Sequence, residues 1–207
     1  MDKKTESIFY ALNEEVAQLF YRWKIFEQLF SSEGNLRLLN TSGSNVFYLL
    51  HVLILDNVFL TLCRLTDPAQ QGSNENASIP NLVARIDGVI DAATRQSLRA
   101  RLAELEKVCE NMRDHRRKRI AHIDVNCALR AGTEWLMRPT WGEVEDGLSL
   151  VREVMQAIGL ALFNRSSVDD DPLISAGCDG DTLLHVLRKA HGTEEAGQRV
   201  AAPEGGH

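Results

Sequence analysis

The feature of this sequence that most constrains its fold is a helical spacing of large apolar residues near its start. This spacing puts the apolar side chains on one face of a helix, and other helices must cover that face to bury it. We therefore predict one long amphipathic helix over residues 5–31, with other helices packed against it. The apolar residues recur at steps of three and four: Ile8, Leu12, Val16, Leu19, Phe20, Trp23, Phe26 and Phe30.

Similar patterns and end signals predict four further helices. The second is apolar on most faces, which favours a central position. Ser78 can cap the third helix, with Pro80 in its first turn. Thr140 and Glu143 have the spacing of a capping box at the start of the fifth. The predicted helices cover residues 45–65, 79–90, 92–122 and 140–164.

These elements predict an all-α fold, a helical bundle of about five main helices with a short C-terminal helical appendage. No repeat or strand pattern is evident, and residues 68–77 have the polar composition of a surface loop. We assign residues 1–165 to the bundle and 166–191 to the appendage, whose helix is expected over 181–190. Residues 192–207 are rich in Gly, Ala, Glu and Pro, which predicts a disordered tail.

Composition narrows the class of protein. Hydrophobic residues make up 44% and charged residues 25%, as in ordinary globular proteins. The net charge of −6 excludes a general polyanion binder, so contact with nucleic acid requires a local basic patch.

The sequence also indicates a reducing, cytoplasmic setting without membrane insertion. The four cysteines form no CxxC pair and are predicted to be buried, reduced thiols: Cys63, Cys109, Cys127 and Cys178. The N-terminus lacks the apolar segment of a signal peptide. The most apolar stretch, residues 46–65, contains polar residues that a membrane span rarely carries.

One short segment is strongly basic. Five of the 23 lysines and arginines lie between Arg113 and Arg119. Cations suit the C-terminus of a helix, where the macrodipole is negative, so a solvated helix end is the simplest interpretation. The apolar stripe that leads to this segment, however, continues to Arg116 at its next step. Its members are Leu98, Leu102, Leu105, Cys109 and Met112.

Arg116 is therefore predicted to face inward, and Arg117, about 100° further round the helix, to be more exposed. An inward guanidinium needs an acceptor, which could be Asp56 or Asp67, a subunit interface, or an anionic ligand. His122 does not share a face with Arg116 on an ideal helix, although the long arginine side chain could still reach the same cleft. His115 and His122 share a face, but the surrounding cations oppose a divalent ion, so we predict no metal and no cofactor.

The residues from Arg116 to Asp124, with Ala121-His122-Ile123-Asp124 at their end, resemble the signature of the HEPN superfamily, in its abortive-infection-associated, AbiU-type branch. Three other segments resemble that branch in order: residues 64–67, 78–82 and 139–143. The resemblance covers residues 10–165. The family often has Asn or Asp directly after the motif arginine, where this chain has Arg117. Arg117 could therefore be the motif arginine instead of Arg116.

The resemblance implies a homodimer whose two motifs face each other and, in active members, a metal-independent endoribonuclease. RNA carries its own nucleophile, so His122 would act as general acid or base and Arg116 would stabilise the charge on the phosphorane. A setting in bacterial defence or toxin–antitoxin systems, with an antitoxin as protein partner, follows from the same resemblance. The remaining expected site residues are Arg113, Arg117, Lys118 and Arg119 as phosphate ligands, and Arg64, Asp67 and Asp124 as supporting residues.

Two alternatives remain open at this level. Many HEPN proteins are non-catalytic RNA-binding or interaction modules, in which the basic helix end only docks a partner. Arg116 could also be a purely structural residue, paired with an acid of its own or a second chain.

Overall fold

The structure, a computed structural model, describes residues 2–121, 124, 125, 129, 138–164 and 177–200, with side chains up to residue 192. The fold is all-α, as predicted, with one very short hairpin. The chain forms two compact units. Unit 1 comprises residues 1–20 and 55–172, and unit 2 comprises residues 21–54 and 173–207. Helices α1 (Lys3–Phe30) and α2 (Glu33–Leu65) contribute to both.

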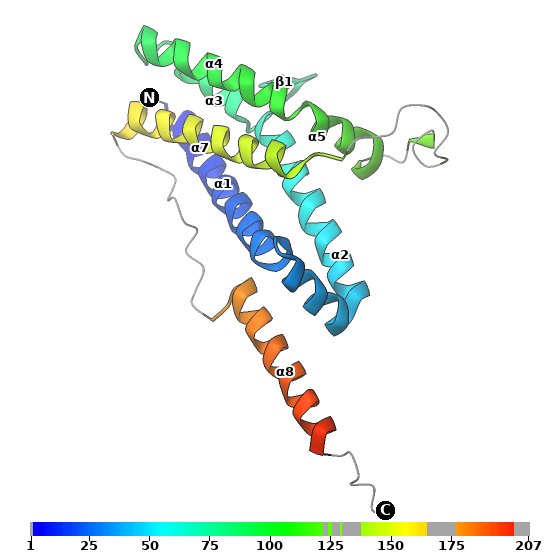
Figure 1. Cartoon of the computed structure of the whole chain (residues 1–207). Helices are drawn as coiled ribbons and strands as arrows, with labels where there is room; N and C mark the ends of the chain where they lie inside the picture. Colours follow the sequence, from blue (N-terminus) through cyan, green and yellow to red (C-terminus); the bar gives the residue numbers. More distant parts are fainter. Residues whose placement is uncertain (1, 122–123, 126–128, 130–137, 165–176, 201–207) are drawn as a thin grey trace, which may run out of the picture. The chain divides into compact units, whose positions relative to one another are not determined.

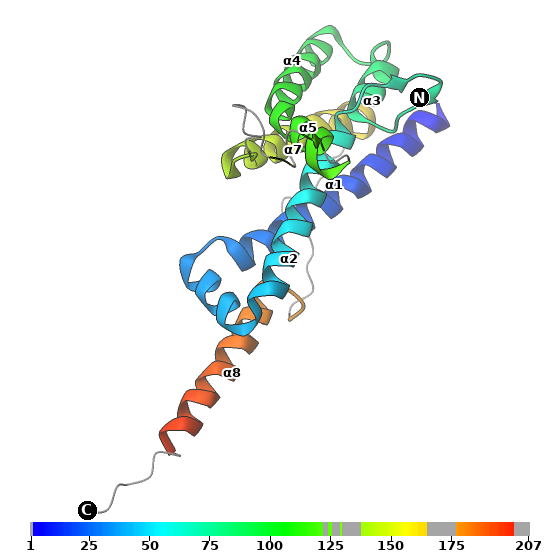
Figure 2. The same ribbon diagram turned by 90° about the vertical axis from the view of Figure 1, so that its right-hand side faces the viewer.

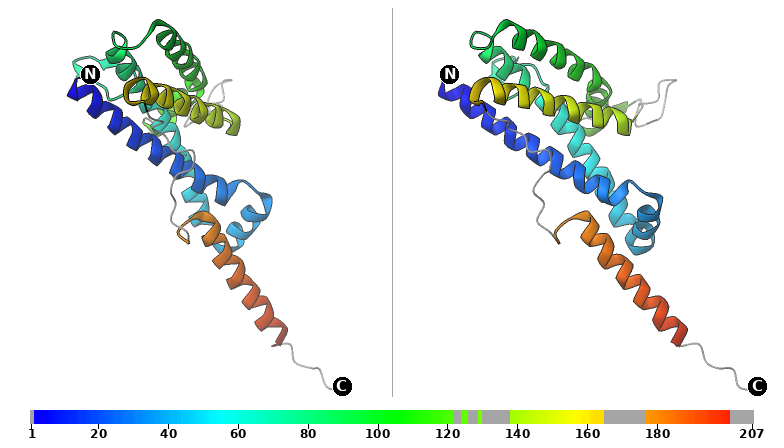
Figure 3. Two further views of the ribbon diagram at one scale, coloured as in Figure 1. Left: turned by 90° about the vertical axis from the view of Figure 1, so that its left-hand side faces the viewer. Right: turned by 60° about the vertical axis from the view of Figure 1, so that its left-hand side comes forward.

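Unit 1 is a helical bundle. In Figures 1 and 3, α7 lies between α4 and the first part of α1. A Cβ atom at Gly147 of α7 would lie 3.6 Å from Leu62 of α2 and 3.8 Å from Val108 of α4, so these three helices pack closely. Its other elements are β1 (Gln70–Gln71), β2 (Asn74–Glu75), α3 (Ile79–Ile86), α4 (Ala92–Val108), α5 (Glu110–His115), the π-helical turn η1 (Arg116–Ile120) and α7 (Trp141–Phe163).

Two predicted helix starts are confirmed. Ser78 caps α3 by accepting a hydrogen bond from the backbone N of Asn81, and Pro80 lies in the first turn. Thr140 and Glu143 form the capping box of α7, with both reciprocal hydrogen bonds present. These side chains satisfy amide groups that have no partner within the helix, so they fix where each helix begins.

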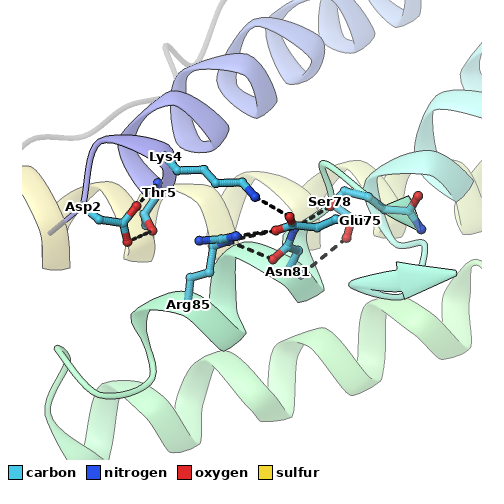
Figure 4. Close-up of polar contacts among 8 residues, drawn as sticks. Asp2, Lys4, Thr5, Glu75, Ser78, Asn81 and Arg85 are labelled. Atoms are coloured by element: carbon cyan, nitrogen blue, oxygen red, sulfur yellow. Dashed lines mark hydrogen bonds and ion pairs between the residues drawn. The ribbon is translucent and has the colours of Figure 1, made fainter. Parts of the chain in front are cut away.

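The polar loop predicted over residues 68–77 contains the hairpin, which pairs Gln70 with Glu75. Gly72 takes a positive φ of 61° in its turn, a conformation that favours glycine. Glu75 then accepts hydrogen bonds from Lys4, Asn81 and Arg85 (Figure 4). A segment without large apolar residues is thus tied to α1 and α3 by one carboxylate.

The prediction of one continuous helix over residues 92–122 is wrong. Helix α4 ends at Val108, and α5 starts again after Cys109. From Arg116 the backbone is π-helical, since the amide of Ala121 donates to the carbonyl of Arg116 at 2.8 Å. The spacing of apolar residues indicates which face of a helix is buried. It does not indicate where the backbone hydrogen bonds change from the α to the π pattern.

The predicted second helix also differs. Helix α2 begins at Glu33, before the expected start at residue 45, and Gly43 interrupts it with non-helical backbone angles. The predicted central position holds for its last turns, where Val58, Leu62 and Cys63 are buried. It is wrong for the turns before them, because Val46, Tyr48, Leu49 and Leu53 are 54–65% exposed. In the described part of the chain, α2 is the one helix long and apolar enough to cross a membrane, by length and composition only. The core helix of a soluble protein can have the same length and composition.

Unit 2 combines the end of α1, the first part of α2 and α8 (Gly180–Val200). Figure 2 shows the short segment of α2 before Gly43 turning back on the longer one. An aromatic cluster joins α1 to α2, with the ring of His51 5.0 Å from those of Phe26 and Phe30. Arg188 of α8 donates to Asn35 at 2.7 Å.

Helix α8 continues past residue 190, so residues 192–200, expected in a disordered tail, are helical. The segment after Gly192 contains Glu and Ala residues with good helix propensity, and this outweighs the isolated glycines. Residues 201–207 lie outside the described residues, as do 165–176, so the predicted division at residue 165 stays a prediction.

Candidate functional site

The inward arginine predicted at the end of the apolar stripe is paired with an acid of its own chain. Nη1 of Arg116 donates to Oδ1 and Oδ2 of Asp67 at 3.0 and 3.2 Å. Asp67 follows the C-terminus of α2, so this pair ties η1 to that helix end. Of the two acids considered as partners, the structure selects Asp67.

The exposed fractions of Arg116 and Arg117 agree with the prediction from the apolar stripe that Arg116 faces inward. The side chain of Arg116 is 33% exposed and that of Arg117 is 68% exposed. Arg117 donates to Asp114 at 2.6 Å, and Nζ of Lys118 lies 3.5 Å from the same carboxylate. Two of the predicted phosphate ligands in η1 therefore share one acid of α5, Asp114.

Arg113, predicted as a phosphate ligand, contacts the end of α2 in the structure. Its Nη2 donates to the carbonyl oxygen and to the hydroxyl of Thr66, the residue directly after α2. The hydroxyl of Thr66 in turn donates to the carbonyl of Leu62 at 2.8 Å. Arg113 is thus a half-buried cap on the C-terminal end of α2, where a cation suits the helix dipole.

His115 is a feature that the sequence reasoning did not single out as buried. It is 3% exposed, and its ring meets that of Phe59 edge to face at 5.5 Å. Nε2 lies 3.9 Å from Oδ1 of Asp56, and Nδ1 has no hydrogen-bond partner among the described residues. Burial lowers the pKa of His115, an effect that Asp56 opposes and the charges of Arg119 and Arg138 reinforce. The ring is therefore neutral at pH 7.

Two of the described cysteines belong to the core of unit 1. Cys63 and Cys109 are fully buried, and burial raises their pKa values to about 11 and about 12. Both are protonated at neutral pH and are not nucleophiles. The prediction of buried, free thiols is confirmed for these two and wrong for Cys178, which is exposed; Cys127 lies outside the described residues.

The other predicted site residues are Arg64, Asp124 and His122, and the structure does not place all of them at the Arg116–Asp67 pair. Arg64 forms an ion pair with Glu15 at 3.1 Å and does not join the Arg116–Asp67 pair. Asp124 is half-buried, and its backbone N donates to the carbonyl of Lys118 at 3.1 Å. His122 lies outside the described residues, so its distance from Arg116 stays a prediction.

This geometry is a semi-buried arginine anchored by a carboxylate within a cationic helix end, where a phosphate could be bound. No curated protein and no solved structure matches the chain. A family model, HEPN_AbiU2, described as AbiU2, matches residues 2–179, which confirms the resemblance drawn from the motif residues. Since this match spans most of the 207 residues, the chain belongs to the HEPN_AbiU2 family, an abortive-infection branch of HEPN-like proteins.

Proposed function

We propose that this protein is a metal-independent endoribonuclease that acts in abortive infection, in the cytoplasm, as a homodimer. The observation that carries the proposal is the state of Arg116. Asp67 accepts both of its hydrogen bonds from Nη1, and the side chain of Arg116 is 33% exposed, so the planar guanidinium has further donors that a phosphate could accept. Family membership supports the same conclusion.

In the proposed mechanism the 2′-hydroxyl of RNA attacks the adjacent phosphorus and the 5′-oxygen leaves. His122 accepts or supplies the proton, a task suited to imidazole near neutral pH. Arg116 stabilises the charge that develops on the non-bridging oxygens, and Asp67 holds it in place. A second chain would supply the second acid or base. We propose an antitoxin-type protein as a partner that restrains the activity.

The test is cleavage of a mixed cellular RNA pool by purified protein in EDTA. We expect cleavage by the wild type and a loss of at least about 100-fold in His122→Ala, the usual cost of removing a general acid or base. His185→Ala is the matched control, since His185 is an exposed histidine of α8 and should leave the rate unchanged. Cleavage that requires added metal, or that survives in His122→Ala, would contradict the proposal.

A second candidate is a non-catalytic RNA-binding or interaction module. The ion pair between Arg116 and Asp67 favours it, because a structural role already accounts for part of the guanidinium's donors. This candidate predicts that the wild type binds RNA without cleaving it in any buffer. It also predicts that His122→Ala binds RNA as tightly as the wild type does.

A further inference from the structure

Helix α2 carries a row of exposed aliphatic side chains in unit 2. Val46, Leu49, Leu50 and Leu53 lie at positions i, i+3, i+4 and i+7, so they share one face of the helix. Each is at least 36% exposed, whereas the other side of the same turns packs on α1 through His51. We call these four residues the α2 ridge. A row of this length is rarely left uncovered on a monomeric protein.

An open groove of about 350 Å³ borders the ridge, and the residues that line it all belong to unit 2. Its apolar lining comes from α1, α2 and α8 and includes Ile54 and Leu183. Ile54 follows Leu50 by one turn of α2, so the groove begins where the ridge ends. Its two charged residues, Arg22 and Asp179, have opposite signs. The groove is therefore apolar and its lining has no net charge.

The ridge and the groove match each other in size. A cavity of about 150 Å³ holds one benzene molecule, so a groove of about 350 Å³ has room for two or three aliphatic side chains. The ridge residues, with Tyr21 and Leu183 at the groove, expose on the order of 500 Å² of apolar surface. A homodimer interface of standard size takes about 800 Å² from each partner, about 65% of it apolar. The two surfaces together therefore supply the apolar area that such an interface needs.

The lack of charge on these surfaces favours a second copy of the chain as their occupant. Between Arg37 and Arg64, the sequence has one residue among Asp, Glu, Lys and Arg, which is Asp56. Two chains of net charge −6 repel each other, and this repulsion is weakest where acids are few. Two-fold symmetry requires a patch that fits itself, as a neutral ridge beside a neutral groove does. A membrane surface is a poorer match, because helices that bind it carry Lys and Arg on their polar face.

We propose that unit 2 forms a homodimer contact in which the α2 ridge of each protomer packs into the groove of its partner. The choice of a second copy rests on the proposed function, whose site needs a second chain. A two-fold dimer contains this contact twice. A charge placed on the ridge or in the groove would therefore be buried at both contacts, where it has no partner.

The experiment measures the dissociation constant of the dimer by sedimentation velocity of the full-length protein over a dilution series. Leu49→Lys puts a charge on the ridge, and Leu183→Glu puts one in the groove. Each buried charge should cost at least about tenfold in affinity, so each variant should raise the dissociation constant by at least about 100-fold over the two contacts. Leu160→Lys is the matched control, because Leu160 of α7 is 55% exposed and Leu49 is 56% exposed. It should leave the dissociation constant unchanged.

A mixture of Leu49→Lys and Leu183→Glu separates this contact from a general loss of folding. In a mixed dimer, one contact joins an unaltered ridge to an unaltered groove, and the other brings opposite charges together. The mixture should therefore form dimers at concentrations at which each variant alone is monomeric. A misfolded variant could not recover association in this way.

A wild type that stays monomeric, a dimer that neither variant weakens, or a mixture that does not recover association would each overturn the inference. Flotation of monomeric wild type with phosphatidylcholine vesicles, abolished by Leu49→Lys, would also overturn it, because the ridge would then bind a membrane. The cleavage assay decides the proposed function separately. A ridge-and-groove dimer that does not cleave RNA would support the contact and reject the nuclease, whereas cleavage by a dimer that both variants leave intact would do the reverse.

Discussion

Arg116 donates to Asp67 from one nitrogen only, and this single contact bears on both stability and function. The two side chains are 33% and 23% exposed, so water screens the ion pair only in part. Removing the acid would leave a semi-buried guanidinium without its partner. A cationic helix end would also lose one of the few acids that offset its charge.

We therefore predict that Asp67→Asn lowers the free energy of unfolding by about 1 kcal/mol, a value between those of exposed and buried ion pairs. Urea denaturation followed by circular dichroism would measure it. The same change at Asp114, whose partner Arg117 is 68% exposed, should cost less. If Asp114→Asn lowered the free energy of unfolding as much as Asp67→Asn or more, the Arg116–Asp67 pair would not be the more stabilising of the two.

Among the elements, those with explicit end signals were predicted best. The side chains of Ser78, Thr140 and Glu143 determine their own hydrogen bonds, so residue type and spacing suffice to place them. The break at Cys109 and the π-helical turn after His115 were not predictable in this way. They depend on how α5 packs against α2, where His115 enters the core beside Phe59.

In the candidate site, too, the features set by the local sequence were predictable and those set by packing were not. The stripe predicted that Arg116 is more buried than Arg117, because burial follows from helical phase. The choice of Asp67 over Asp56 and the capping role of Arg113 depend on contacts between residues that are far apart in the sequence. No local pattern contains that information.

The hairpin is the element whose stability should depend most visibly on acid. Hydrogen bonds from Lys4, Arg85 and Asn81 lower the pKa of Glu75 from an ordinary 4.5 to about 2. A carboxyl with a lowered folded-state pKa stabilises the fold above its unfolded-state pKa, and this contribution is lost as the pH falls through the folded-state pKa. The contribution should therefore be complete above about pH 4.5 and decline toward pH 2.

Glu75→Gln tests this prediction. At pH 7 the variant should unfold at a lower urea concentration than the wild type. The difference should shrink as the pH falls from about 4.5 to about 2, because the wild-type carboxyl then becomes neutral too. A difference that stays constant over this range would show that the hydrogen bonds seen in Figure 4 do not depend on the charge.

Helix α8 should be sensitive to a single methyl group at its start. A Cβ atom at Gly180 would lie 2.9 Å from Cβ of Gln28 and 3.2 Å from Cγ of Leu29, closer than side chains tolerate. Gly180→Ala should therefore loosen α8 from α1 and cost about 1–3 kcal/mol, as overpacking does. Hydrogen exchange of the amides of α8 would measure the loss.

Gly192→Ala is the matched control in the same helix, because a Cβ atom there meets nothing within 4 Å. It should stabilise α8 by roughly 0.5–1 kcal/mol, the difference in helix propensity between the two residues. Equal protection of α8 in both variants would mean that the close approach at Gly180 does not limit its packing.

For the whole molecule, the central question is whether one chain carries a complete site. One motif offers one arginine anchored by Asp67 and one histidine, whereas cleavage of RNA needs both an acid and a base. The neutral, buried ring of His115 faces Asp56 and Phe59, which makes it a poor substitute for the second group. A second copy of the chain is the simplest source of that group.

The proposed homodimer therefore predicts a concentration dependence of the proposed activity. Cleavage per chain should be constant well above the dissociation constant of the dimer and should fall in proportion to the dimer fraction on dilution. Light scattering and RNA cleavage measured over the same dilution series would compare the two quantities directly. Constant activity per chain across a dimer-to-monomer transition would place the whole site in one protomer, and the second catalytic group would then have to come from this chain's own residues.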